Sequence, residues 1–297
     1  MRFRIKPIFS LFKEAFQEWQ QDKASLLAAA LAYYTVFSVT PLLVIAIAIV
    51  GAVFGQEEAR TTILGQINEL VGEQGAQAIE MALNNANQPQ LSGVASLISV
   101  LVLLVGASGV FAQLQEALNI IWNVRVQPKG GIWGFIRKRL LSFGMVLIIG
   151  FLLLVSLVLS AVLSGISQLE IALLDNFTLA IQLLNLVNLV ISFGFVTVLF
   201  ALIYKYLPDA KIRWQDVWVG AIVTTLLFGL GKYLIGLYLG RGSLGSAYGA
   251  AGSLIIFLAW VFYSAQILLF GAELTQVYAR RYGRTIRPSS GAEVSKF

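Results

Sequence analysis

Six long apolar segments take up most of the chain. A helix that crosses a membrane needs about 20 apolar residues, and six segments reach that length: 26–54, 91–124, 140–166, 177–206, 217–239 and 248–278. The stretches between them are short, apart from residues 55–90. The pattern therefore predicts an all-α fold: a polytopic membrane protein with a bundle of about six transmembrane helices over residues 26–279.

Residues 1–25 carry a different pattern ahead of the first span. Large apolar residues recur there at the spacing of one helix face, with basic residues between and beside them. A helix of this kind lies in the membrane interface. We predict an amphipathic cytoplasmic interfacial helix whose apolar face consists of Ile5, Ile8, Phe9, Phe12, Phe16 and Trp19.

Two further segments lie outside the predicted spans. Residues 55–90 contain two apolar runs at helical spacing, interrupted by Gly72 and Gly75. We predict two short amphipathic helices lying over the outer face of the bundle. The segment 280–297 is basic and is predicted to be a disordered cytoplasmic tail, because it contains the run Pro288, Ser289, Ser290 and Gly291.

Lysine and arginine alternate between the two sides of the predicted bundle. Of the 21 Lys and Arg residues, 18 fall before the first span, in the second and fourth loops, and after the last span. Cytoplasmic segments carry such an excess, so both termini are predicted to be cytoplasmic. The distribution accounts for the net charge of +6 without nucleic acid. We expect membrane lipids with anionic headgroups as partners, bound by Arg125, Arg137, Lys138 and Arg139.

Composition excludes several classes of function. The chain is 58% hydrophobic and 12% charged, whereas a soluble domain carries about 25% charged residues. It contains no Cys and no His. It therefore lacks disulfides, thiolate nucleophiles, the usual zinc ligand and the usual general base near neutral pH. We predict no enzyme activity, no metal and no cofactor.

Pro41 lies mid-way along the first predicted span. Proline has no backbone N–H, so the carbonyl of Phe37 loses its helical partner. Within a membrane that carbonyl must find another donor or line a cavity. Transporters use broken helices in this way, and a packing kink is the alternative. The nearest polar candidates for a substrate or transport site are Tyr33, Tyr34 and Ser38.

Glu116 and Glu273 are the acids inside or at the edge of predicted spans. Each lies about 24 residues, or about 36 Å of helix, from the outer end of its span. Both are therefore expected near the cytoplasmic interface. One interpretation is a structural ion pair or interfacial anchor. The other is a functional site, either a polar floor for a substrate or a proton relay.

Polar groups on three spans converge on this inner region. The first span contributes the Phe37 carbonyl that Pro41 leaves free. Asn119 follows Glu116 on the second span, and Tyr263 and Gln266 precede Glu273 on the last span. Polar groups that face lipid are costly. We therefore predict a cavity bounded by the first, second and last helices and open towards the cytoplasm. A closed bundle in which these groups satisfy one another is the alternative.

Four strings in the spans have a recognisable order and spacing. They are Ala30-Leu31-Ala32-Tyr33-Tyr34 with Ser38 and Pro41; Ala117-Leu118-Asn119 with Trp122; Tyr206-Leu207-Pro208-Asp209 with Trp214 and Gly220-Ala221; and Tyr248-Gly249 with Trp260, Tyr263 and Gly271-Ala272-Glu273-Leu274. Together they resemble the YihY/virulence factor BrkB family of integral membrane proteins over nearly the whole chain.

The resemblance implies a six-helix, multi-pass protein of the bacterial cytoplasmic (inner) membrane. Members of the family have been linked to serum resistance and to envelope biogenesis, and are often supposed to be transporters. A ribonuclease label has also circulated for the family. It finds no support in this sequence, which has no His, no Cys and no clustered catalytic acids.

Three hypotheses about function follow. The leading one is a transporter-like protein that handles a lipid or another amphipathic envelope molecule, because the ionisable residues of the spans gather near the cytoplasmic surface. A cation–proton antiporter that uses Glu116 and Glu273 is the alternative. A non-transporting scaffold that assembles envelope enzymes belongs to another class. The sequence leaves the substrate, the coupling ion and the oligomeric state open.

Overall fold

Long helices make up most of the described structure. The computed structural model describes residues 5–86, 94–126, 178–241, 252–282, 287–289 and 292–294. The third predicted span, 140–166, lies outside this part of the chain, as do Arg137, Lys138 and Arg139. The elements are α1 (Ile5–Gln21), α2 (Ala24–Phe54), α3 (Gln56–Ala86), α4 (Val94–Ile121), β1 (Val124–Val126), α6 (Thr178–Tyr206), β2 (Ala210–Lys211), α7 (Trp214–Arg241), α9 (Gly252–Arg281), β3 (Arg287–Pro288) and β4 (Ala292–Val294).

Four helices of the described part are long and apolar enough to cross a membrane. The segments that meet this criterion are Ala24–Ala52, Leu189–Tyr206, Trp214–Leu234 and Leu254–Arg281. The second predicted span contains α4, whose 28 residues are largely apolar. These helices confirm the expected fold class, an all-α polytopic membrane protein.

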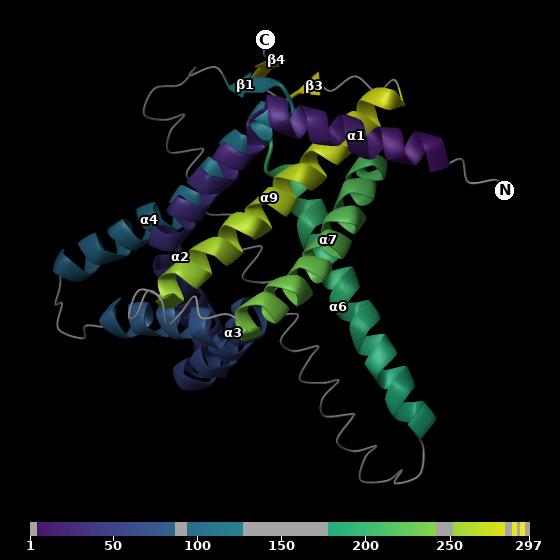
Figure 1. Cartoon of the computed structure of the whole chain (residues 1–297). Coiled ribbons are helices and arrows are strands. Elements are labelled where there is room, and N and C mark those ends of the chain that lie inside the picture. Colours follow the sequence, from purple (N-terminus) through teal and green to yellow (C-terminus); the bar gives the residue numbers. More distant parts are fainter. Residues whose placement is uncertain are drawn as a thin grey trace.

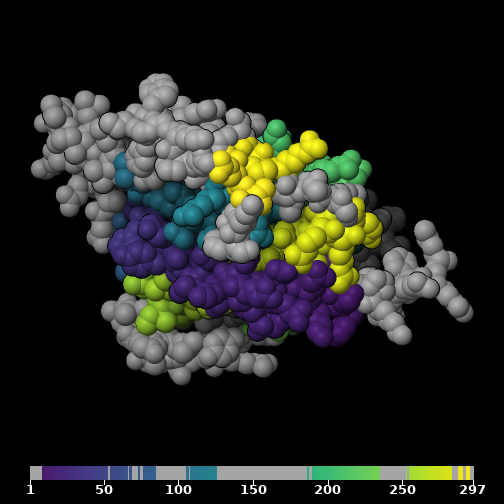
Figure 2. All heavy atoms as spheres, turned by 90° about the horizontal axis from the view of Figure 1, so that it is seen from above, coloured from purple at the N-terminus to yellow at the C-terminus, as the bar shows by residue number. Residues whose placement is uncertain are grey.

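The helices are arranged around α9, which runs through the middle of the described bundle and contacts α1, α2, α3, α4 and α7. In Figure 1, α1 crosses one end of the bundle and α3 lies at the opposite end. The short strands lie at the same end as α1. We call this end the terminal face, because both ends of the described chain lie there (Figure 2 views it from above).

One side of α1 packs against α9, while other apolar residues of α1 stay exposed. Leu11, Phe12 and Ala15 contact a cluster on α9 that includes Leu274 and Val277. The Phe12 ring lies 6.2 Å from that of Phe270. By contrast, Phe9 and Phe16 are exposed. The predicted amphipathic helix therefore forms, but part of its apolar face is buried against α9.

Glycines allow α7 and α9 to approach closely. A Cβ atom on Gly220 would lie 1.7 Å from Oγ1 of Thr275, and one on Gly271 would lie 1.8 Å from Oγ1 of Thr224. Small residues permit such contacts between membrane helices. Tyr204 of α6 joins the same crossing, because its hydroxyl donates to the Leu268 carbonyl at 2.7 Å and lies 2.8 Å from the Thr224 hydroxyl.

Pro41 does not break α2, which stays helical through the proline. A Cβ atom on Gly106 of α4 would lie 3.2 Å from Cγ of Pro41. One turn earlier, the Ser38 hydroxyl donates to the Gly106 carbonyl at 2.6 Å. The broken helix is therefore not observed, and the packing alternative fits, because the proline packs against a glycine of the neighbouring helix.

The segment after α2 has helical backbone from Gln56 to Ala86, with no interruption at the two glycines. Yet Arg60 donates a hydrogen bond to Asn84 and lies 3.9 Å from Glu80. Arg60 and Asn84 are 24 residues apart, and a straight helix would separate them by about 36 Å. α3 therefore doubles back on itself. The expected two helices correspond to two limbs of one element.

The tail is not disordered where the structure describes it. β4 pairs antiparallel with β1, and β3 pairs antiparallel with β2. The Ser289 N–H also donates to the Asp209 carbonyl at 2.8 Å. Sequence composition alone missed these strands because their backbone groups are satisfied by the loops after α4 and α6, far away along the chain.

Candidate functional site

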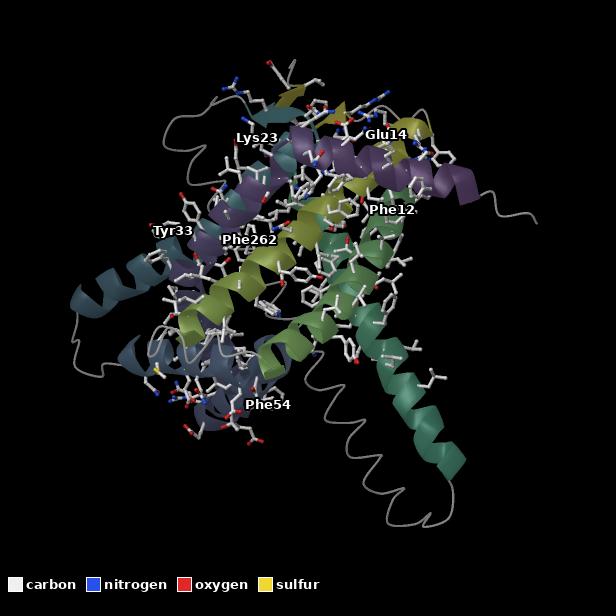
Figure 3. The ribbon with its side chains drawn as sticks, in the orientation of Figure 1. Phe12, Glu14, Lys23, Tyr33, Phe54 and Phe262 are labelled. Carbon is white, nitrogen blue, oxygen red and sulfur yellow. The ribbon has the colours of Figure 1, made fainter. Side chains whose placement is uncertain are left out.

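Two arginines at the end of α9 hold α1 on the terminal face. Arg280 lies 2.7 Å from Glu14 and 2.6 Å from Glu18. Arg281 lies 2.7 Å from the other oxygen of Glu14, and donates to Ser10 at 2.9 Å. Each arginine thus bonds more than one group on α1. Figure 3 shows Glu14 beside this end of α9.

A sharp turn at Lys23 joins α1 to α2 and positions the residue before it. Lys23 has a left-handed backbone conformation, with φ 52°. The N–H of Asp22 still bonds the Glu18 carbonyl at 2.9 Å, so Asp22 continues the last turn of α1. The chain then turns and enters the bundle (Figure 3). As a result, the Asp22 side chain lies at the junction of α1, α2 and α9.

Glu273 of α9 meets Asp22 at this junction. Its side chain is fully buried, with 0% exposure. Neither carboxylate oxygen accepts a hydrogen bond from an N–H or hydroxyl group of the described residues. The group within hydrogen-bonding reach is the carboxyl of Asp22, and Glu18 adds further negative charge nearby. Two carboxyl groups in contact repel unless one carries a proton, so the pair is suited to bind a proton.

Other polar atoms near the terminal end of the bundle are also buried without a partner. In the part of the chain that the structure describes, the indole N–H groups of Trp19 and Trp122 donate to nothing, and Oε1 of Gln276 accepts nothing. Both tryptophans pack in or against the cluster that contains Ala24 and Ala272. Gln276 lies one turn after Glu273 on α9. The described residues at this end of the bundle therefore include several buried polar atoms with unused hydrogen-bonding capacity.

The acids at the terminal face fall into two electrostatic classes. Burial tends to raise the pKa of Glu14, but hydrogen bonds from Arg280 and Arg281 outweigh it, and the pKa lies below its usual value. Burial raises the pKa of Asp22, and the charge of Glu18 raises it further. The salt bridges to Arg280 and Arg281 thus favour the ionised form of Glu14, whereas the surroundings of Asp22 favour its protonated form.

A second polar cluster joins α4 to the loop after α6. The Asn119 amide donates to the Asp209 carboxylate at 2.9 Å, and its oxygen accepts from the Asp209 N–H at 2.8 Å. Gln115 donates to the same carboxylate at 3.2 Å. All of these groups have partners. The cluster therefore serves as a cross-link that fixes the loop between α6 and α7.

The predicted site residues are dispersed over several surroundings. Tyr33 (Figure 3) and Tyr34 are exposed on α2, whereas Ser38 is buried. Glu116 is exposed on α4, unlike Glu273. The two acids predicted to act alike therefore have different environments.

The other predicted residues also have assigned places. Asn119 belongs to the cross-link, and the Tyr263 ring fills the space beside Gly231 of α7. Gln266 is half-buried on α9. Arg125 is exposed opposite Glu293 in the β1–β4 pair. The predicted cavity between the first, second and last helices stays a prediction.

Sequence reasoning missed Asp22 and Asp209 as site residues. Asp22 comes just before the first apolar run, and only the turn at Lys23 brings it to α9. Asp209 ends the string Leu207-Pro208-Asp209, which carries the family resemblance but has no pattern that indicates a binding or catalytic role. An acid directly beside an apolar span is the one signal that marks Asp22.

Comparison with known proteins identifies the family. The family model described as Virulence factor BrkB matches residues 15–295. This chain belongs to the BrkB family. The resemblance found in the sequence is thereby confirmed.

Curated relatives of this BrkB family protein are named as membrane proteins. UPF0761 membrane protein MS0032 of Mannheimia succiniciproducens is 28% identical over 280 residues, covering 92% of this chain and 90% of that protein. A UPF0761 membrane protein of Verminephrobacter eiseniae is 31% identical and covers 92% of this chain. The chain spans 62% of the Verminephrobacter protein and 59% of a 30% identical Pseudomonas aeruginosa relative. No solved structure matches this chain.

The BrkB-like strings meet one another in the fold. Asn119 of the second string bonds Asp209 of the third. Gly220 of the third packs against Thr275, one residue past the fourth string, which itself contains Gly271 and Glu273. The second, third and fourth strings therefore lie at contacts between elements, and the fourth supplies Glu273 of the acid pair.

Proposed function

We propose that this BrkB family protein is a proton-coupled transporter in which Asp22 and Glu273 bind and release the coupling proton. The observation that carries the proposal is a fully buried carboxyl group whose neighbour is a second carboxyl group. A structural acid in this position would be expected to face a base. Here the guanidinium of Arg280, whose charge also acts on Glu273, is bonded to Glu14 and Glu18.

The proposed cargo is a lipid or another amphipathic envelope molecule. α2 contains no charged residue, and α6 contains only Lys205, in its last turn. α9 has none before Glu273. A small-ion pathway needs charged or strongly polar groups deeper in the membrane. An amphipath instead keeps its headgroup near the terminal face, while its apolar part stays in lipid.

A cation–proton antiporter is the second candidate, because the same acid pair suits exchange of a proton for a cation. The structure favours a different pair from the one that the sequence suggested. Glu116 is exposed, so Asp22 takes its place beside Glu273. The two candidates share the proton site and differ in the cargo.

Flux measurements in sealed vesicles test both candidates. The protein is reconstituted with a trapped pH dye and a labelled phospholipid, and an acid-inside gradient is imposed. Headgroup-dependent lipid redistribution coupled to the pH change supports the amphipath, and a sodium-dependent pH change supports the antiporter. Glu273→Gln should abolish the signal, while Glu116→Gln, an exposed acid on α4, should retain it.

The absence of both fluxes from a folded preparation would contradict the proposal and favour the scaffold hypothesis. Loss of flux in both glutamine variants alike would also contradict it, because the effect would then not be specific to the buried pair. Folding is followed by thermal unfolding and by size-exclusion profile for each variant.

A further inference from the structure

The two strand pairs on the terminal face differ in their charges. In the β1–β4 pair, Arg125 lies directly opposite Glu293, an attractive combination. In the β2–β3 pair, Lys211 lies directly opposite Arg287. Side chains directly opposite in an antiparallel pair project on the same face, and like charges there are destabilising. Both residues are exposed, so the fold presents two cations side by side.

The acids nearest to this pair along the chain are already used. Asp209 accepts hydrogen bonds from Asn119 and Gln115. Asp216 is buried in the first turn of α7. Within the described ranges, neither Lys211 nor Arg287 forms a salt bridge. An exposed Arg213 adds a further positive charge close by in the chain.

An aromatic shelf borders the cations. Tyr206, Trp214 and Trp218 are all exposed, with ring centroids 5.9 Å apart for the first pair and 6.2 Å apart for the second. The Lys205 ammonium lies 5.8 Å from the centre of the Trp214 ring. Exposed Trp and Tyr of this kind gather at the level of lipid headgroups.

The position of the shelf sets the depth of the cations. The span in α6 ends at Tyr206, and the span in α7 begins at Trp214. Residues 207–213 therefore form the turn between two spans, and Lys211 lies within that turn. The cation pair consequently sits at the membrane boundary, within reach of headgroups rather than far out in water.

We propose that Lys211 and Arg287 form a binding site for the phosphate of an anionic phospholipid headgroup, with Trp214 and Trp218 packing on the lipid beneath it. The phosphate supplies the negative charge that the β2–β3 pair lacks, and so stabilises the docking of the tail. The site is separate from the Asp22–Glu273 pair and does not depend on transport.

Lipid binding to the purified protein in a zwitterionic detergent tests the site. Phosphatidylglycerol or phosphatidylcholine is added, and bound lipid is counted by native mass spectrometry. Each basic residue near an anionic surface contributes about fivefold in affinity. The variant Lys211→Gln/Arg287→Gln should therefore lose at least about tenfold in preference for phosphatidylglycerol. The matched variant Lys13→Gln/Lys232→Gln removes two exposed charges elsewhere and should change it less than twofold.

Thermal unfolding supplies an independent readout. Without anionic lipid, the Lys211→Gln/Arg287→Gln variant should unfold at the same or a higher temperature than the wild type, because the like-charge repulsion is gone. Added phosphatidylglycerol should stabilise the wild type and leave this variant unchanged. Equal binding of phosphatidylglycerol by the wild type and the variant would overturn the proposal. Inorganic phosphate that stabilises the wild type as well as phosphatidylglycerol does would overturn the assignment to lipid.

Discussion

Glu273 is the residue whose surroundings say most about mechanism. It is buried on α9, and its hydrogen-bonding neighbour is an acid. An amide in its place would donate a hydrogen bond to the Asp22 carboxylate without first taking up a proton, and bonds to charged groups contribute about 1.5–3 kcal/mol. We expect Glu273→Gln to raise the free energy of unfolding at neutral pH by about 1–3 kcal/mol, measured by chemical denaturation in detergent. A lower stability would show that a base pairs with Glu273.

Asp22 gives the protein a stability that depends on pH. Its pKa in the folded protein lies above its usual value of 3.8. A raised pKa contributes stability that is complete below the usual pKa and is lost as pH rises through the folded pKa. The amide group in the variant Asp22→Asn does not titrate. The variant should therefore gain melting temperature relative to the wild type as pH rises from about 4 towards neutrality; a gap that is constant with pH would contradict this.

The stability that Glu14 contributes should depend on pH in the opposite direction, because the pKa of Glu14 lies below its usual value. The salt bridges from Glu14 to Arg280 and Arg281 should contribute fully above the usual carboxyl pKa. They should weaken as pH falls through the pKa of Glu14 in the folded protein. Exposed pairs of this kind contribute about 1 kcal/mol or less. Glu14→Gln should therefore lower stability only slightly at neutral pH. The effect should disappear at low pH, as followed by thermal unfolding. Gln17→Glu, an exposed change on α1, is a suitable control.

At the scale of elements, the crossing of α7 and α9 allows a sharp test. A methyl group on Gly220 would lie 1.7 Å from Oγ1 of Thr275, whereas one on Gly229 of the same helix meets nothing within 4 Å. Overpacking costs about 1–3 kcal/mol. We expect Gly220→Ala to destabilise the protein by that amount and Gly229→Ala to be neutral or stabilising, both measured by thermal unfolding. Equal effects would mean that the two helices are not in contact at Gly220.

The elements also show where sequence reasoning succeeds and where it ends. The described spans could be predicted because lipid demands a long apolar run, whatever the helix packs against. The bend that folds α3 back on itself could not be predicted, because it depends on a hydrogen bond between Arg60 and Asn84, which are 24 residues apart. The strands of the tail could not either, because β3 and β4 consist of two and three residues and depend on β2 and β1 for partners.

The candidate site was predictable only in part, for a similar reason. Glu273 could be chosen because an acid near a span is costly and therefore notable. Its partner could not be chosen, because the left-handed turn at Lys23 decides which side chain reaches α9. Glu116 met the same sequence criterion but lies on an exposed side of α4.

At the scale of the whole molecule, α1 and the tail lie at one end of the bundle and α3 lies at the other. Single cysteines can report this, because the chain contains none. Cysteines at Lys13 and Glu293 should react with a membrane-impermeant reagent from one side of the membrane. A cysteine at Glu80 should react from the other side. The basic residues predict that the first side is cytoplasmic, and labelling of all three positions from the same side would rule out this topology.

The pairing of β3 and β4 with strands that precede them in the chain also constrains the order of assembly. Residues 287–294 are synthesised after every described helix, so β1 and β2 must wait for their partners until α9 has left the ribosome. The terminal face is therefore the last part of the described protein to close. Until then, the loops after α4 and α6 remain accessible to insertion factors and proteases, and a bulky tag fused close behind Val294 would delay or prevent closure.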